Sequence, residues 1–201
     1  MTRPTIVEAR PTIVEEGQFR VAIGSDTAHA SFQPRSVVQG QLTVQGRGAL
    51  EPRRAFVEYH RAVDGAPERA LIGGVLEPSG SGTFRVVVAT SGDAAAAGSA
   101  TYPAVLGKAM FPGLPAEFGA AVKDALLRET GVVGTLVVDR AACDLAGSSE
   151  GAFGTAAALL ALVLGCQTLE QASTAVRERL RDMVGWSLLQ QLEPAPGGSR
   201  A

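Results

Sequence analysis

The segment with the clearest chemical potential is a glycine and serine run, Ala146-Gly147-Ser148-Ser149-Glu150. Backbone N–H groups at the start of a helix attract anions, and a glycine lets an anion approach the backbone. The run therefore has part of the pattern of a phosphate-binding loop. Glu150, however, places a carboxylate where a phosphate would bind, and the sequence contains no Gly-x-x-x-x-Gly-Lys-Ser/Thr loop. We interpret Ser148 and Ser149 as helix-capping residues and expect no nucleotide binding.

Two histidines and two cysteines are the other side chains that could support catalysis. His29 lies in a turn-like segment and His60 in a strand-like one, and neither has the spacing of a catalytic pair with a cysteine or serine. Cys143 and Cys166 each end an apolar run and lack the spacing of zinc ligands. We predict that both cysteines are small buried residues, and that the protein has no enzyme activity, metal or cofactor.

Arginines are the candidate binding residues. The chain carries 18 basic and 20 acidic residues, so its formal charge of −2 excludes a global basic field for nucleic acid. An RNA partner would have to meet a local patch. Basic residues gather in two groups: Arg47, Arg53, Arg54, Arg61 and Arg69, and then Arg177, Arg179 and Arg181. Solvated faces are the simpler interpretation of both groups. A turn is predicted at residues 64–67, and the candidate binding residues around it are Arg53, Arg54, Arg61, Arg69, Asp64 and Gly65.

Hydrophobic periodicity predicts the elements that position these residues. Alternating apolar residues predict a twisted antiparallel sheet, with strands at 19–23, 37–44, 55–60, 70–72 and 83–89. The second half predicts helices at 115–130 and 150–164 around a strand at 135–142. A last helix is expected to begin at Thr168, because Gln171 follows three residues later in a capping-box pattern. We expect the first two helices to pack on one face of the sheet.

The chain begins with a tandem repeat, in which Arg3–Glu8 recurs as Arg10–Glu15. We expect one copy to be an edge strand or an ordered arm and the other to be a loose duplicate. The predicted organisation is an extended arm at 1–17, one α+β domain at 18–192 and a flexible tail at 193–201. No signal-peptide core or membrane-length apolar run is present, so a cytoplasmic location without membrane contact is expected.

The order of residues from 111 to 162 resembles the fourth domain of elongation factor G and the tetracycline ribosomal-protection proteins. The matching residues are Gly113-Leu114-Pro115, Val137-Val138-Asp139 and Ser148-Ser149-Glu150-Gly151-Ala152-Phe153. Upstream, Glu77-Pro78 and the glycine turn before Phe84 extend the likeness, so that it covers residues 54–162. The resemblance implies a ribosomal-protein-like βαβ fold, an antiparallel twisted sheet with helices on one face.

The resemblance also implies a function. In that family two loops at one end of the domain reach the ribosome, and they correspond here to residues 63–68 and 140–147. The second loop is shorter than in the family and lacks its histidine. The resemblance implies a non-catalytic protein that binds the ribosome or rRNA, or that mimics a translation factor. It also implies a link to antibiotic self-protection. Arg140 lies at the second loop and is a further candidate binding residue.

Two alternatives stay open at this point. The first is a small-molecule-binding or homodimeric accessory protein on the same scaffold, which the shortened loops favour. The second is a phosphate binder that uses Ser148 and Ser149, because kinases of the galactokinase and homoserine kinase group share this fold.

Overall fold

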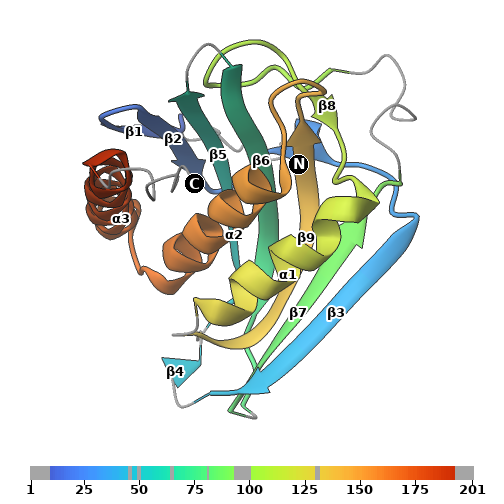
Figure 1. Cartoon of the computed structure of the whole chain (residues 1–201). Helices are drawn as coiled ribbons and strands as arrows, with labels where there is room; N and C mark the ends of the chain where they lie inside the picture. Colours follow the sequence, from blue (N-terminus) through green and yellow to red (C-terminus); the bar gives the residue numbers. More distant parts are fainter. Residues whose placement is uncertain are drawn as a thin grey trace, which may run out of the picture.

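A single mixed sheet organises the computed structural model, which describes residues 10–44, 47–48, 51–63, 66–80, 82–92, 101–129 and 132–192. Within these residues the fold is α+β (Figure 1). The order of the main strands is β1 (Thr12–Glu16), β2 (Phe19–Gly24), β5 (Arg53–Val63), β6 (Ala66–Glu77), β9 (Val132–Cys143), β7 (Thr83–Thr90) and β3 (Ser36–Thr43). Two short strands, β4 (Arg47–Gly48) and β8 (Phe111–Pro112), also pair with β9. The sheet is open, with β1 and β3 at its two edges.

The prediction of an antiparallel sheet is confirmed for most strand pairs and wrong for two. β9 runs parallel to β7 and also to the short β4. The β7–β9 pair is parallel because the chain crosses between these strands through a helix, which returns it to the same end of the sheet. Alternation within a strand carries no information about the direction of its neighbour, so this pairing was not predictable from local pattern.

Three α-helices in the described part of the chain cover one face of the sheet (Figure 1). α1 (Gly119–Arg128) packs on β3 and β7, α2 (Glu150–Gly165) packs on β5 and β6, and α3 (Leu169–Leu192) packs on β1 and β2. α1 and α2 also contact each other, which confirms the predicted one-face arrangement. The first helix starts later than expected, because residues Ala116–Phe118 form a 3-10 turn (η3) before it.

Ser149 and Thr168 start the last two helices as local patterns predicted. The Ser149 hydroxyl accepts a hydrogen bond from Ala152 N, which satisfies one of the free N–H groups of the first turn of α2. The Thr168 hydroxyl accepts one from Gln171 N, and the Gln171 side chain reaches back to Gln167 N. The capping-box prediction is therefore confirmed, with its return bond one residue earlier than usual.

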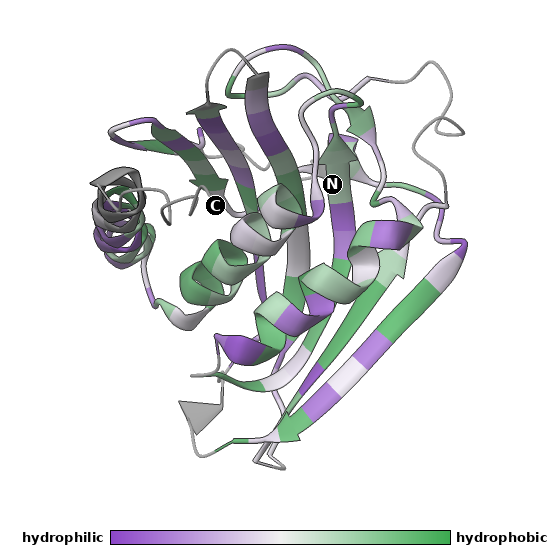
Figure 2. Cartoon of the chain, viewed as in Figure 1, coloured by the Kyte–Doolittle hydropathy of each residue, from purple (hydrophilic) through white to green (hydrophobic). Residues whose placement is uncertain are grey.

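Buried apolar side chains lie on both faces of the sheet. The larger cluster fills the space between the sheet and the helices, and it includes Val57, Tyr59, Phe84 and Phe153. The colouring by hydropathy shows hydrophobic residues dominating the length of α2, which lies over the middle of the sheet (Figure 2). A smaller cluster lies on the opposite face and consists of Ala30, Phe56, Leu71, Tyr102, Met110 and Ala142. Successive strand residues point to opposite faces, so β5 contributes to both clusters.

The second copy of the N-terminal repeat forms β1, an edge strand as predicted. It pairs antiparallel with β2, and its Val14 is fully buried in the main cluster. The first copy and the predicted tail at 193–201 lie outside the described residues. Among the described residues, none of the helices has the length and apolar content needed to cross a membrane.

Candidate functional site

Three strands turn at one end of the sheet, which lies at the top of Figure 1 and which we call the tip end. β5 finishes there at Val63, β6 starts there at Ala66, and β9 finishes there at Cys143. The turn that follows β9 lies against the first residues of β6, since Gly147 O accepts a hydrogen bond of 2.8 Å from Arg69 N. A Cβ at Gly147 would collide with the carbonyl oxygen of Pro67, so this close approach requires glycine.

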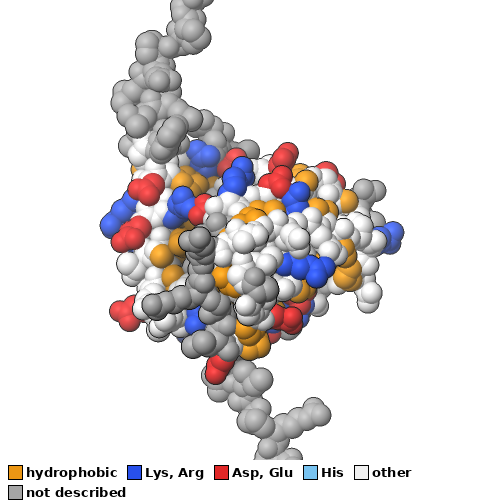
Figure 3. Space-filling model, turned by 90° about the horizontal axis from the view of Figure 1, so that it is seen from below, with side chains coloured by type: hydrophobic (Ala, Val, Ile, Leu, Met, Phe, Trp, Pro, Cys, Tyr) orange, Lys and Arg blue, Asp and Glu red, His pale blue; other side chains and the backbone are white. Residues whose placement is uncertain are grey.

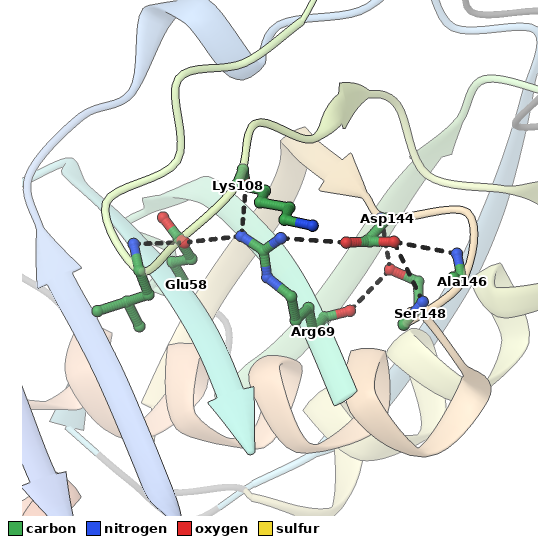
Figure 4. Close-up of polar contacts among 8 residues, drawn as sticks. Glu58, Arg69, Lys108, Asp144, Ala146 and Ser148 are labelled. Carbon is green, nitrogen blue, oxygen red and sulfur yellow. Dashed lines mark hydrogen bonds and ion pairs between the residues drawn. The ribbon is translucent and has the colours of Figure 1, made fainter. Parts of the chain in front are cut away.

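Arg69 is the centre of a polar network at the tip end (Figure 4). Its side chain is buried, with the whole residue only 3% exposed. One guanidinium nitrogen, Nη1, donates to Asp144 Oδ2 at 3.1 Å. The other, Nη2, donates to Lys108 O at 2.7 Å and lies 3.8 Å from Glu58 Oε1. A single arginine thus joins β6, β5, the turn after β9 and the surface loop that contains Lys108.

Glu58 holds that surface loop, residues 101–110, against the sheet. Its carboxylate has no solvent exposure and accepts hydrogen bonds from Val105 N at 2.7 Å and Leu106 N at 2.9 Å. Burial raises the pKa of Glu58 above its ordinary value, and the two N–H groups and Arg69 offset part of that rise. Two backbone donors and one guanidinium are what a buried carboxylate needs to remain charged without a large penalty.

Asp144 and Ser148 close the turn between β9 and α2. One oxygen of Asp144, Oδ1, accepts hydrogen bonds from Ala146 N and Gly147 N. The Ser148 hydroxyl accepts a hydrogen bond from Asp144 N and donates to Arg69 O at 2.7 Å. Burial acts to raise the pKa of Asp144, but these N–H groups and Arg69 outweigh it, so the pKa lies below its ordinary value.

The polar groups of this network bind one another, as in a structural clamp. Its carboxylates bind backbone N–H groups and an arginine, and the hydroxyls of Ser148 and Ser149 both have protein partners. The start of α2, which could have faced a phosphate, already uses Ser149 as its cap. The network therefore holds the loop at residues 101–110 and the turn between β9 and α2 beside each other, so that their exposed side chains face solvent at the same end of the sheet.

The remaining predicted arginines do not form one exposed face with Arg69. Arg53 and Arg54 lie at the start of β5, eight or more residues from the turn that starts after Val63. The side chain of Arg54 binds both oxygens of Asp139, at 2.9 and 3.0 Å, and Arg53 donates to Cys166 O. Arg140 binds the same carboxylate of Asp139.

Arg61 is near the tip end and half-buried, 3.6 Å from Glu68 and 5.3 Å above the Phe19 ring. Asp64 and Gly65 lie outside the described residues. The prediction of a shared, exposed basic face is therefore wrong, because strand length separates Arg53 and Arg54 from the tip end and burial encloses Arg69.

The two cysteines differ in burial. Cys143 is buried, and burial raises the pKa of its thiol to about 11. Cys166 is only half-buried, so the prediction of two buried cysteines holds for Cys143 alone. Burial lowers the pKa of His60, whose Nδ1 has no hydrogen-bond partner there. In that part of the chain, His, Cys, Asp and Glu side chains form no group of three or more suited to a metal ion.

Glu58 and Asp144 were not predicted as site residues. The one local signal for Glu58 was its position among the alternating apolar residues of a strand, which gave no indication of its partners. Asp144 directly follows an apolar strand and lies three residues before a glycine, a pattern shared by many ordinary turns. No protein-family model and no curated protein matches this chain.

Proposed function

We propose that this protein is a non-catalytic binding protein similar to the fourth domain of elongation factor G, and that it contacts the ribosome or rRNA through the tip end. The observation that carries the proposal is that the start of β6 lies against the turn after β9. These residues belong to the two segments that the resemblance matches to ribosome-contacting tips, 63–68 and 140–147. Residues 66–69 and 144–147 lie against each other at this end, joined by Arg69 and Gly147. The parallel β7–α1–β9 unit is consistent with the ribosomal-protein-like βαβ fold that the resemblance implies.

The formal charge of −2 means that an RNA contact must be local. Seen from below, at the end opposite the tip end, acidic and basic side chains are interspersed, with no broad field of one sign among the coloured residues (Figure 3). At the tip end, Lys108 is exposed on the loop held by Glu58, and Arg61 is half-buried on β5. A contact through a few cations on RNA phosphates depends on salt, with each phosphate contact adding roughly 0.7 to 0.9 to the slope of log K against log salt.

Co-sedimentation with ribosomes over a series of KCl concentrations tests this proposal. The wild type should pellet with ribosomes at low salt, and the double variant Lys108→Glu/Arg61→Glu should lose binding and the accompanying salt dependence. The matched control is Arg85→Glu, because Arg85 is exposed on β7, away from the tip-end network, and donates to Gln39 on the neighbouring strand. Failure of the wild type to pellet even at low salt would overturn the proposal and leave the homodimeric or small-molecule accessory protein in its place.

Antibiotic protection is the form of this function that the ribosomal-protection proteins suggest. In a cell-free translation reaction inhibited by tetracycline, the wild type should restore protein synthesis and the Lys108→Glu/Arg61→Glu variant should not. Binding to ribosomes without any restoration would separate ribosome association from protection.

A further inference from the structure

A cavity of about 410 Å³ lies at the opposite end of β5 from the tip end. It is enclosed by the end of α2, the start of α3, the end of β2 and the start of β5. In Figure 1 the α2–α3 connection is at the lower left. Its volume falls within the range of pockets that bind small molecules, roughly 300–1,000 Å³. No residue of the tip end lines it, so its role is independent of the proposed ribosome contact.

Apolar side chains make much of the cavity wall. Ala55, Val163, Leu164 and Ala172 are all at least nine-tenths buried and belong to the main hydrophobic cluster. Leu169, at the first position of α3, is 40% exposed, a large apolar side chain at the edge of the cavity. An apolar ligand body in this cavity would be removed from water and would cover Leu169, both of which favour binding.

The charge at the cavity is positive. Arg53 donates a hydrogen bond of 2.6 Å to the backbone carbonyl of Cys166, which is neutral. Within the described residues, no carboxylate lies at ion-pair distance from Arg53. Arg54 lines the cavity too, but its charge is balanced by Asp139. Arg10 is exposed and also lines the cavity.

The start of α3 does not add to this charge. Thr168 and Leu169 line the cavity, but the Thr168 hydroxyl already caps Gln171 N, and Glu170 places a carboxylate in the first turn. The cavity thus combines an apolar wall with one guanidinium that has unused donors, an arrangement suited to a single anionic group.

We propose that this cavity binds a small organic anion with an apolar body, its carboxylate or sulfonate meeting the Arg53 guanidinium. The apolar part lies between α2 and β5, against Val163 and Ala55. Arg53 has further N–H donors beyond the one that Cys166 O accepts, so it binds the anion without breaking that bond. Anion binding is proposed for the cavity alone and does not depend on ribosome binding.

Cys166 supplies an internal reporter of occupancy. It lines the cavity and is half-buried, whereas Cys143, the other cysteine, is buried with a thiol pKa of about 11. An alkylating reagent should therefore modify Cys166 first, because the thiolate is the reactive form and access is required. A ligand in the cavity should slow that modification.

The test uses two fluorescent probes of similar shape, the anion 1-anilinonaphthalene-8-sulfonate and the uncharged N-phenyl-1-naphthylamine. The sulfonate probe should bind the full-length protein with one-to-one stoichiometry and slow iodoacetamide modification of Cys166, followed by mass spectrometry. Arg53→Met should weaken the sulfonate probe by roughly tenfold or more, the scale of one charge-assisted hydrogen bond, and leave the uncharged probe unchanged. Arg53→Lys should keep part of the preference, and Arg85→Met, remote from the cavity, should keep all of it.

Three results would overturn the proposal. One is no binding of the sulfonate probe by a wild type that unfolds cooperatively. Another is binding that leaves the modification rate of Cys166 unchanged, since the probe would then occupy a different place. The third is equal affinity of wild type, Arg53→Met and Arg53→Lys for the sulfonate probe, since recognition would then be apolar only. Thermal unfolding of each variant separates a loss of binding from a loss of fold.

Discussion

Arg69 links more of the molecule than any other side chain in the tip-end network, and its removal should destabilise the fold strongly. Arg69→Met would leave the buried carboxylate of Glu58 and the Asp144 side chain without their shared cation. Breaking a buried ion pair in this way costs about 3–5 kcal/mol. Urea unfolding followed by circular dichroism should show a loss of this size.

Arg61→Met is the matched comparison for Arg69→Met. Arg61 lies on β5, next to the residue that pairs with Arg69 across the sheet. Its own ion pair with Glu68, however, is partly exposed. Exposed pairs contribute about 0–1 kcal/mol, so this variant should differ little from wild type in the same urea measurement. Similar losses for the two variants would contradict the assignment of Arg69 as the clamp.

Asp144 makes the stability of the turn after β9 depend on acid. Its folded pKa lies below the ordinary 3.8, because N–H groups and Arg69 outweigh the effect of burial. Such a carboxylate stabilises the fold fully above its unfolded pKa, and the contribution is lost as pH falls through the folded pKa. Asp144→Asn should therefore be less stable than wild type at about pH 6 and approach it at about pH 2.5. A difference that grows on acidification would contradict this sign.

At the scale of elements, a pair of phenylalanines joins the two central helices. Phe118, at the end of the turn before α1, stacks on Phe153 in α2, with ring centroids 5.4 Å apart. Phe153 is fully buried, but Phe118 is only partly so. η3 contacts both α1 and α2, so Phe118 lies at the boundary between the two helices.

Truncation of the two rings should therefore have unequal costs. Phe153→Ala should cost about 3–5 kcal/mol, the range for a buried phenylalanine. Phe118→Ala should cost clearly less, because part of that ring is already in water. Thermal unfolding of the two variants measures the difference, and a larger loss for Phe118 would mean that its stack on α2 dominates the local packing.

At the scale of the molecule, one hydrophobic cluster includes residues from the edge strand β1 to α3. Val14 and Phe19 lie in it together with Ala172, Val176 and Leu180 of α3. α3 therefore covers the β1–β2 end of the sheet, and an ion pair between Arg181 and Glu16 joins the two at 3.3 Å. A continuous cluster of this kind favours cooperative unfolding.

A truncated chain that ends at Gly165 should lose this cooperativity. Without α3, the apolar side of β1 and β2 would be exposed to water, so near-UV and far-UV circular dichroism should no longer melt together. A chain that ends at Leu192, which lacks only the predicted tail, is the control and should melt as the full chain does. A single sharp transition in the shorter chain would show that α3 is an addition to an independent domain.

The sequence by itself determined most of the main elements, although it predicted only residues 70–72 of β6 and neither of the short strands β4 and β8. Alternation predicted the strands around Phe56 and Phe84, and the caps at Ser149 and Thr168 predicted two helix starts. These features are decided within a few residues of one another, by side-chain period and by hydrogen bonds of the first helical turn. The local pattern was therefore enough to predict these strands and helix starts, with small errors at the strand ends.

Only the tertiary structure decided which residues meet at the tip end and at the cavity. Arg69 reaches Asp144 across 75 positions of the chain, and Arg53 reaches Cys166 across 113. The sequence shows that an arginine is present but not whether its guanidinium donates hydrogen bonds to a carboxylate, a carbonyl or solvent. Whether an arginine is a binding residue or a buried clamp depends on its strand partner and its burial, and both are properties of the packed sheet.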